Sequence, residues 1–184
     1  MIKFDKVKRF ADVDIELPRR KTEDSAGYDF VVAEDTIIPA YHNLNEILCS
    51  YIDKTYKENT AISPMNLAEV KNITKTTKCK PTLVPTGVKC AMEPGQYLEI
   101  SMRSSSPLNY WLILANGIGI IDRDYWSNES NDGEIFFQVI NLFPFDIIIQ
   151  KGETIGQGII KNYLKTDEDF SADKRTGGFG STDK

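Results

Sequence analysis

The chain has 184 residues, of which 22 are lysine or arginine and 27 are aspartate or glutamate, giving a net charge of −5. A length close to one typical domain of about 150 residues predicts a single domain over residues 1–184 and excludes a multidomain machine. The negative charge argues against a protein that coats nucleic acid by neutralising phosphates. No run of about 18 apolar residues occurs, and the N-terminus is charged, so we expect neither a membrane span nor export.

Cysteine and histidine usage narrows the chemistry. The three cysteines, Cys49, Cys79 and Cys90, are odd in number and lack C-x-x-C spacing, so neither a zinc knuckle nor a closed disulfide framework is indicated. His42 is the only histidine, which leaves histidine-based catalysis or metal binding without support. These features favour a reduced, cytoplasmic compartment.

Most of the chain has the pattern of short β-strands. Segments rich in Ile, Val, Tyr and Phe alternate with Gly, Pro and Asn turns, which is typical of an all-β sandwich or barrel. In chain order the expected strands are Tyr28–Val32, Thr36–Ile38, Thr82–Met92, Tyr97–Met102, Trp111–Ala115, Ile135–Ile140, Phe145–Ile149 and Thr154–Tyr163.

A block of about residues 41–80 breaks this pattern. From Asn43 to Lys57 the apolar residues recur on one side of a 3.6-residue period, which predicts an amphipathic helix. We interpret the block as a helical insertion between two strands. Its apolar stripe is expected to pack against the β body or a neighbouring subunit.

A second helix is expected within the same insertion. Ser63 suits an N-cap, Pro64 suits the first helical position, and Ile62 can contact Leu67 across the cap. The helix is expected to run towards Asn72.

The middle of the chain carries two polar segments. Asn116 and the glycines after it form a hairpin-like turn that leads into Asp122 and Asp124, which share a face only if the segment is a regular strand. Solvated turn carboxylates are the alternative. The run Arg103-Ser104-Ser105-Ser106 suits an anion or, equally, a capped turn.

The C-terminus is rich in glycine. Over residues 175–182, free amides, hydroxyls and the adjacent Lys174 and Arg175 suit a phosphate chain, and Phe179 can cover a flat ring. A disordered tail is the alternative. The P-loop pattern is absent, because no Gly-Lys-Ser/Thr follows a strand.

The order of these segments resembles the five motifs of the trimeric deoxyuridine triphosphate nucleotidohydrolases, the dUTPases. Any one motif is weak, but five in the right order are a strong signal. The matching segments are Ser25 to Phe30, Arg103 to Ser105, Asn116 to Tyr125, Gly152 to Gln157 and Arg175 to Thr182. The match covers the chain except the insertion near 41–80 and a smaller one at Ser127–Asp132.

The resemblance implies a fold, an assembly and a reaction. The fold would be a distorted jelly-roll-like β barrel or sandwich, and the protein a homotrimer whose sites are shared between subunits. The reaction would be the Mg²⁺-dependent hydrolysis of dUTP to dUMP and pyrophosphate, which limits uracil incorporation into DNA and supplies dUMP for thymidylate synthesis. Neither nucleic acid nor membrane is an expected partner.

The same resemblance implies roles for the third motif. Asp122 would be the base that activates a water for in-line attack on the α-phosphorus. Tyr125 would lie against deoxyribose, where a 2′-hydroxyl would clash. Asn116 and the backbone of Gly119, Ile120 and Ile121 would bind the uracil edge.

Phosphate and metal contacts follow from the other motifs. Arg103, Ser104, Ser105 and Gln157 would contact the phosphates, with Asp124 forming an ion pair with Arg103. Asp29 would hold Mg²⁺ through ordered water.

A C-terminal arm of about residues 166–184 would close over the nucleotide. Phe179 would cover uracil, while Arg175, Gly180, Ser181 and Thr182 would hold the γ-phosphate. Lys174 stands where the family has arginine, Arg175 stands where it has glycine, and Asp183 replaces its final glycine. Which of the two cations meets the γ-phosphate is therefore open.

Two alternative functions remain. A dCTP deaminase shares the fold, but its proton-shuttling Glu lies in a strand where this chain has Gln138, which cannot transfer that proton. A regulatory dUTPase-fold protein would use the insertion at 41–80 to bind a protein partner.

Overall fold

The computed structural model of the chain describes residues 1–55 and 64–169. The described strands are β1 (Lys3–Lys6), β2 (Tyr28–Val31), β3 (Thr36–Ile38), β4 (Thr82–Pro85), β5 (Val88–Ala91), β6 (Gln96–Met102), β7 (Leu112–Leu114), β8 (Gly119–Asp122), β9 (Phe136–Asn141), β10 (Ile147–Ile149) and β11 (Thr154–Asn162). The helices are α1 (Tyr41–Thr55), α2 (Leu67–Thr77) and α3 (Ser105–Tyr110), with 3₁₀ turns η1 (Lys8–Phe10) and η2 (Arg123–Tyr125).

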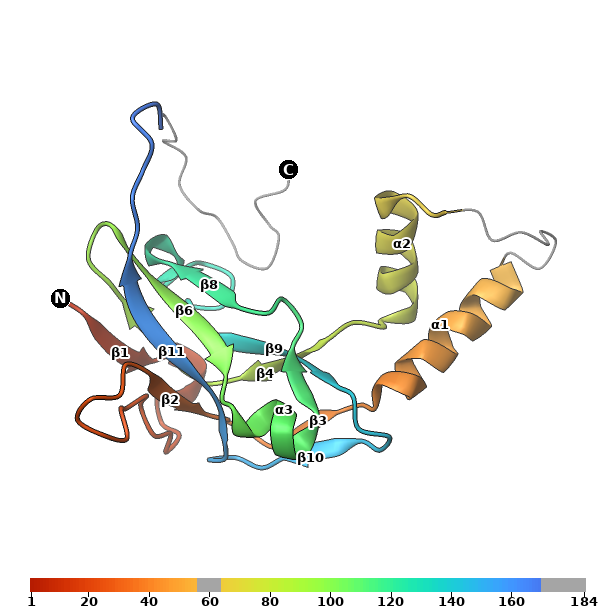
Figure 1. Cartoon of the computed structure of the whole chain (residues 1–184), viewed down its shortest axis with the longest axis horizontal. Coiled ribbons are helices and arrows are strands. Elements are labelled where there is room, and N and C mark those ends of the chain that lie inside the picture. The colour runs from red at the N-terminus through yellow and green to blue at the C-terminus, as the bar shows by residue number, and fades with distance from the viewer. Residues whose placement is uncertain (56–63, 170–184) are drawn as a thin grey trace.

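The strands form small antiparallel sheets. A four-stranded sheet has the order β2-β11-β6-β8, and a three-stranded sheet has the order β4-β9-β7. Two strand pairs, β1 with β5 and β3 with β10, extend this body. The expected all-β, jelly-roll-like fold is therefore confirmed (Figure 1).

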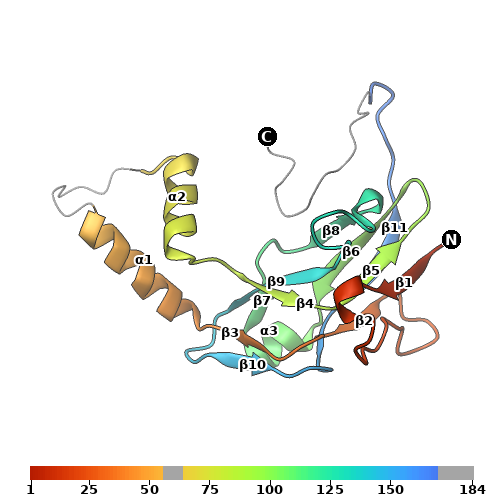
Figure 2. The same ribbon diagram turned by 180° about the vertical axis from the view of Figure 1, so that it is seen from behind.

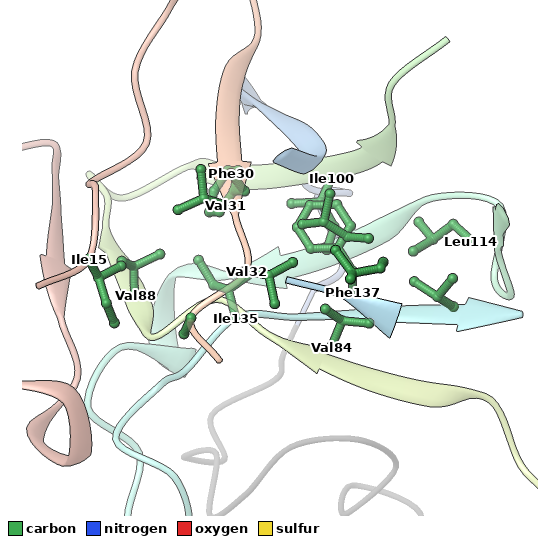
Figure 3. Packing of buried hydrophobic residues seen from close by; sticks show 14 of the residues in the cluster. Ile15, Phe30, Val31, Val32, Val84, Val88, Ile100, Leu114, Ile135 and Phe137 are labelled. Atoms are coloured by element: carbon green, nitrogen blue, oxygen red, sulfur yellow. The ribbon is translucent and has the colours of Figure 1, made fainter. Parts of the chain in front are cut away.

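The hydrophobic core lies between the two larger sheets. Phe30 and Ile100 come from the four-stranded sheet, while Val84 and Phe137 come from the three-stranded sheet (Figure 3). The rings of Phe30 and Phe137 meet edge to face with centroids 5.7 Å apart. Such pairs contribute about 0.5–1.5 kcal/mol beyond the burial of their area, so the two sheets are firmly joined.

The expected strands are right in place, but the strand predictions are wrong at three points: one expected strand is divided, and two observed strands, β1 and β8, are not among those expected. The expected strand Thr82–Met92 is broken into β4 and β5, because the chain turns at Gly87, which has φ +69°. A residue with a Cβ is strained in that region. The N-terminal strand β1, which pairs with β5, was not expected at all.

The helical insertion is present between β3 and β4. Helices α1 and α2 stand away from the β body in both views (Figures 1 and 2). No residue of α1 is buried, and Ile73 is the only buried residue of α2. The apolar stripe of α1 is thus not packed against the β body within the described chain.

The expected start and end of the second helix are wrong. Helix α2 begins after Asn66, whose side chain accepts hydrogen bonds from the N–H groups of Ala68 and Glu69. Glu69 in turn accepts from the N–H of Asn66, which completes a capping box. The reciprocal pair satisfies two backbone donors, so this position outcompetes a start at Pro64. The helix continues past Asn72 to Thr77.

Among the described residues, no helix has the length and hydropathy needed to cross a membrane.

Candidate active site

The polar segment at Asn116 connects the two larger sheets at one edge of the body. Strand β7 ends one sheet and β8 ends the other. Between them the chain reverses in a tight turn, in which the N–H of Gly117 donates to the carbonyl of Leu114 at 3.0 Å. The N–H of Ile118 donates to the carbonyl of Asn116 at 2.8 Å. The turn therefore places Asn116 and β8 beside β9 of the other sheet.

A cavity of about 230 Å³ lies at this edge, and we call it the hairpin cavity. Its lining residues are Ile100, Leu114, Asn116, Gly119, Ile120, Ile121, Asp122, Tyr125, Phe136 and Gln138. Six of the seven third-motif residues to which the resemblance assigned a role are among them, and Asp124 is the exception. The structure thus brings these six residues together.

Asp122 and Asp124 are separated by a change in the chain. Strand β8 ends at Asp122, and Arg123 to Tyr125 form the turn η2. Asp122 lines the hairpin cavity, whereas Asp124 lines a different hollow beside Arg123 and Lys165. The two carboxylates therefore do not act from one strand face.

Tyr125 is the most firmly held of the polar cavity residues. Its side chain is 6% exposed. Its hydroxyl donates to the carbonyl of Glu134 at 3.0 Å and accepts from Nδ2 of Asn131 at 2.6 Å. The ring is thus fixed at its far end while the rest of it lines the cavity.

A second polar group surrounds Arg103, and we call it the Arg103 cluster: Asp29, Arg103, Ser104, Ser105 and Gln157. Gln157 of β11 lies opposite Asp29 of β2 on one side and Ser101 of β6 on the other. Directly opposed residues share a sheet face, and Arg103 follows Ser101 by two residues, which returns it to that face.

An ion pair joins the cluster. Nη1 of Arg103 lies 3.5 Å from Oδ2 of Asp29, a carboxylate that is 8% exposed. Within residues 1–55 and 64–169, that oxygen accepts no hydrogen bond. Within one chain Arg103 therefore pairs with Asp29, and the pair between Arg103 and Asp124 stays a prediction.

The serines after Arg103 begin helix α3. The N–H of Ser106 donates to the carbonyl of Arg103 at 3.0 Å, which closes the first turn. Ser104 occupies the N-cap, but its side chain makes no capping hydrogen bond. Its hydroxyl is thus not used in the way that a capped turn would require.

Asp122 of the cavity and Arg103 of the cluster lie towards opposite ends of β6. Asp122 is opposite Tyr97, whereas Arg103 follows Tyr97 by six residues. At about 3.3 Å per residue, the two backbone positions are about 20 Å apart along the strand. One chain thus presents the expected base and the expected phosphate ligands as two separate groups.

The expected C-terminal contacts lie outside the described residues. These are Arg175, Phe179, Gly180, Ser181 and Thr182, together with the alternative cation Lys174.

Four cavity residues were not predicted as lining residues: Ile100, Leu114, Phe136 and Gln138. Phe136 and Gln138 alternate along β9 with the buried Phe137 and Val139, so they share the face opposite the core. The alternation along β9 predicts that Phe136 and Gln138 share this face, but it does not reveal which segment of the chain covers the face. The answer depends on β8, which belongs to the other sheet.

A larger hollow of about 700 Å³ lies on the other side of Phe136, lined in part by Arg9, Glu34 and Glu134. Its charges are already paired. Arg9 donates to both carboxylate oxygens of Glu134, at 2.6 and 2.8 Å, and these hydrogen bonds raise the pKa of the Arg9 guanidinium. Glu134 also accepts from the N–H of Gly87. The hairpin cavity is therefore the better candidate site.

The chain is similar to proteins of one known family. Residues 65–183 match the family model described as dUTPase. The deoxyuridine 5′-triphosphate nucleotidohydrolase of Lactococcus lactis subsp. lactis (strain IL1403) is 34% identical over 181 residues, covering 97% of this chain and 95% of that protein.

Solved structures give the same result. The crystal structure of dUTPase from Streptococcus mutans has a TM-score of 0.65 and 31% identity, covering 89% of this chain and 98% of that one. A Staphylococcus bacteriophage 80alpha dUTPase mutant with dUpNHpp shares the fold, with a TM-score of 0.55 and 16% identity over 99% of this chain and 98% of that one. From the extent of these matches, the chain belongs to the dUTPase family.

Proposed function

We propose that this chain hydrolyses dUTP to dUMP and pyrophosphate, with Asp122 activating the water that attacks the α-phosphorus. Membership of the family supports dUTP diphosphatase activity. The observation that carries the assignment is the hairpin cavity, where a half-buried carboxylate, an amide side chain, a strand edge and a buried tyrosine meet.

The edge of β8 is suited to bind a uracil base. In the described sheet, β8 pairs with β6 on one side only. Alternate N–H and C=O groups on its other side are therefore available for a base edge. Backbone groups cannot rotate to suit cytosine, and an unmatched buried polar group costs about 1–3 kcal/mol. With Asn116 beside it, this edge provides base selection.

The cavity size suits part of a nucleotide. At about 230 Å³ it is below the range of about 300–1,000 Å³ that is typical of pockets enclosing a whole ligand. We assign it to the base and sugar, with the ring of Tyr125 against the sugar. The triphosphate would extend beyond it.

The Arg103 cluster is assigned to the phosphates. A guanidinium with five donors can bind phosphate oxygens while keeping its contact with Asp29. Gln157 and the hydroxyls of Ser104 and Ser105 add neutral donors. Holding the triphosphate in line with the water contributes to the rate because little other chemistry is required of the protein.

Asp29 is a suitable residue for a Mg²⁺ site. Its buried Oδ2 accepts no hydrogen bond within the described ranges and lies 3.5 Å from Nη1 of Arg103, so this carboxylate has acceptor capacity that the described residues do not use. No group of three or more Asp, Glu, His or Cys residues within those ranges could hold a metal. Mg²⁺ is commonly bound by one carboxylate, water and substrate phosphates, and when bound it neutralises charge on the phosphates.

A complete site requires a second copy of the chain. Asp122 and Arg103 are about 20 Å apart along β6, whereas reacting groups must lie about 3–3.5 Å from one another. An assembly in which one copy supplies the cavity and another supplies the cluster removes this conflict. A homotrimer, as the family resemblance implies, is the assembly that we propose.

An exposed apolar surface near α3 supports this assembly. Trp111 and Phe145 are 57% and 69% exposed, and Phe143 packs its ring against that of Phe145. The N–H of Leu142 donates to the carbonyl of Trp111, which joins the two segments. Contiguous exposed apolar surface of this kind commonly marks a protein interface.

The test is pyrophosphate release from dUTP, dTTP, dCTP and UTP by the wild type and by Asp122→Asn. We expect turnover of dUTP alone by the wild type. The variant should lose about 10²–10⁴-fold in kcat, as for loss of a general base, while it still binds a nonhydrolysable dUTP analogue. Equal rates on all four substrates would overturn the assignment.

The deaminase alternative is weakened by the position of Gln138. This residue lines the hairpin cavity, so a proton-shuttling glutamate at the same position would face the base. An amide cannot transfer the proton. Ammonia release from dCTP would restore the alternative.

A protein partner remains a second proposal, favoured by the exposure of α1. Ile47 is 48% exposed, and no α1 residue is buried. A chain lacking residues 41–80 that still hydrolyses dUTP and loses no partner in a pull-down would remove this proposal.

The three cysteines are free in the structure, which is compatible with the cytoplasmic location that we propose.

A further inference from the structure

The loop Ser127–Asp132, which interrupts the usual third motif, is an ordered structure built around Asn128. This side chain is 8% exposed. Its Oδ1 accepts from the N–H and the hydroxyl of Ser130, at 2.9 and 2.7 Å, and from the N–H of Asn131 at 3.2 Å. Its Nδ2 donates to the carbonyl of Tyr125 and to Oδ1 of Asn131. The loop is therefore closed onto the residue where it begins.

The end of the loop is attached to the β body by Asp132. Its carboxylate accepts from Nζ of Lys89 at 2.9 Å and from the N–H of Lys8 at 2.9 Å. Lys89 is itself 8% exposed and lies over the ring of Trp126, 4.7 Å from its centroid. Gly133 then leaves the loop at φ +81°, where a Cβ would collide with the backbone of Ser127. These contacts hold the loop in one position.

Asn131 connects the loop to the hairpin cavity. Its Oδ1 accepts from Nδ2 of Asn128 at 2.8 Å and from the N–H of Gly133 at 3.1 Å. Both partners are donors, so the amide is oriented with Nδ2 towards the hydroxyl of Tyr125, 2.6 Å away. That hydroxyl also donates its proton to the carbonyl of Glu134, so it both donates one hydrogen bond and accepts one.

We propose that Asn131 is a positioning residue that fixes the ring of Tyr125 against the sugar and thereby sets rejection of the ribose 2′-hydroxyl. The inference rests on the proposed function. A pocket wall rejects a substrate with an added hydroxyl only weakly if the side chains of the wall can move aside. Here the loop holds Tyr125 at two points. Asn128 donates to its backbone carbonyl, and Asn131 donates to the hydroxyl of its ring. The inserted loop therefore serves sugar selection.

The test compares Asn131→Asp with the wild type, using kcat and KM for dUTP, UTP and dCTP. Aspartate keeps the acceptors for Asn128 and Gly133 but replaces the donor to the Tyr125 hydroxyl by an acceptor, so the single proton of that hydroxyl can no longer serve the Glu134 carbonyl while the hydroxyl also bonds residue 131. Loss of one hydrogen bond should lower the dUTP-to-UTP ratio of kcat/KM by about 5- to 10-fold. The dUTP-to-dCTP ratio should stay unchanged, because the base is bound by β8 and Asn116.

Glu129→Gln is the matched control, because Glu129 lies exposed in the same loop. It should leave both ratios unchanged. Asn131→Ala, checked by circular dichroism, supplies a second variant and should reproduce the selective loss. An unchanged dUTP-to-UTP ratio in folded Asn131→Asp, or an equal fall in both ratios, would overturn the inference while leaving the proposed function intact. A wild type that hydrolyses UTP as well as dUTP would instead overturn the role of Tyr125 in the proposed function, and the inference with it.

Discussion

The hairpin cavity and the Arg103 cluster are built in opposite ways. The cavity takes six of its lining residues from the single stretch Asn116–Tyr125, and its tyrosine is buried and hydrogen-bonded at the hydroxyl. The cluster draws on β2, β11 and the junction between β6 and α3, and its Arg103 side chain is 41% exposed with a 3.5 Å ion pair. Under the proposed function, selection of base and sugar depends on a rigid local structure, whereas phosphate binding depends on charges that can rearrange.

The largest effect that sharpens this comparison is expected from Arg103→Ala. Removing a phosphate donor should lower kcat/KM for dUTP by about 10²-fold. Arg123→Ala is the matched control: Arg123 adjoins Asp122 in sequence, but its guanidinium donates to the carbonyl of Met92. A change below about 5-fold is expected there. Steady-state kinetics that ranked the two variants in the reverse order would contradict the assignment of the cluster.

A smaller effect is expected from Asp29→Asn. The amide keeps the shape but removes the charge that faces Arg103 and a hydrated cation. The Mg²⁺ concentration for half-maximal activity should rise by about 10-fold, as expected when a carboxylate contact to the metal is weakened. The measurement is a Mg²⁺ titration after treatment with a chelator. An unchanged Mg²⁺ requirement would remove Asp29 from the proposed site.

The smallest effect concerns the pH dependence of stability, through Asp132, which attaches the loop Ser127–Asp132 to the β body. Burial alone would raise the pKa of the Asp132 carboxyl, but hydrogen bonds from Lys89 and Lys8, with their charges, hold that pKa below the ordinary value of 3.8. A lowered pKa in the folded protein stabilises it above about pH 4, and this stabilisation is lost as the pH falls through the folded value.

We therefore expect Asp132→Asn to lower the free energy of unfolding by about 1 kcal/mol between pH 5 and 8. The difference from the wild type should shrink as the pH falls below 3.8 and disappear once the pH is below the lowered pKa of the folded protein. Chemical denaturation as a function of pH measures it. A difference that grew as the pH fell would show that the Lys89–Asp132 pair has been misinterpreted.

The same contrast explains what the sequence could predict. Six of the cavity residues are close in sequence, and the resemblance of the stretch Asn116–Tyr125 to one family motif was enough to group them. The ion pair of Asp29 and Arg103 depends on the pairing of β2, β11 and β6, and strand pairing cannot be read from local pattern. This ion pair was therefore not predicted.

The helical insertion was predicted because its pattern is local in sequence, whereas the bounds of its second helix were predicted wrongly. The 3.6-residue period identified α1 without any long-range information. The cap of α2 was misplaced because Ser63-Pro64 and Asn66 with Glu69 are both acceptable local starts, and reciprocal side-chain bonds favour the second. The hydrogen bond between Asn131 and Tyr125 could not be predicted from the sequence, because a loop lacks the regular spacing of apolar residues that identifies helices and strands.

Complementation between two inactive variants tests most directly whether one nucleotide is held by Asp122 of one copy and Arg103 of another. Asp122→Asn and Arg103→Ala chains would be coexpressed with different tags, and oligomers that carry both tags would be assayed for pyrophosphate release from dUTP. Sites that combine an intact Asp122 with an intact Arg103 should restore about a third of wild-type activity, because each mixed trimer in a closed ring holds one such site in three. Mixed oligomers as inactive as either variant alone would show that each chain holds a complete site, which would contradict the separation of about 20 Å along β6.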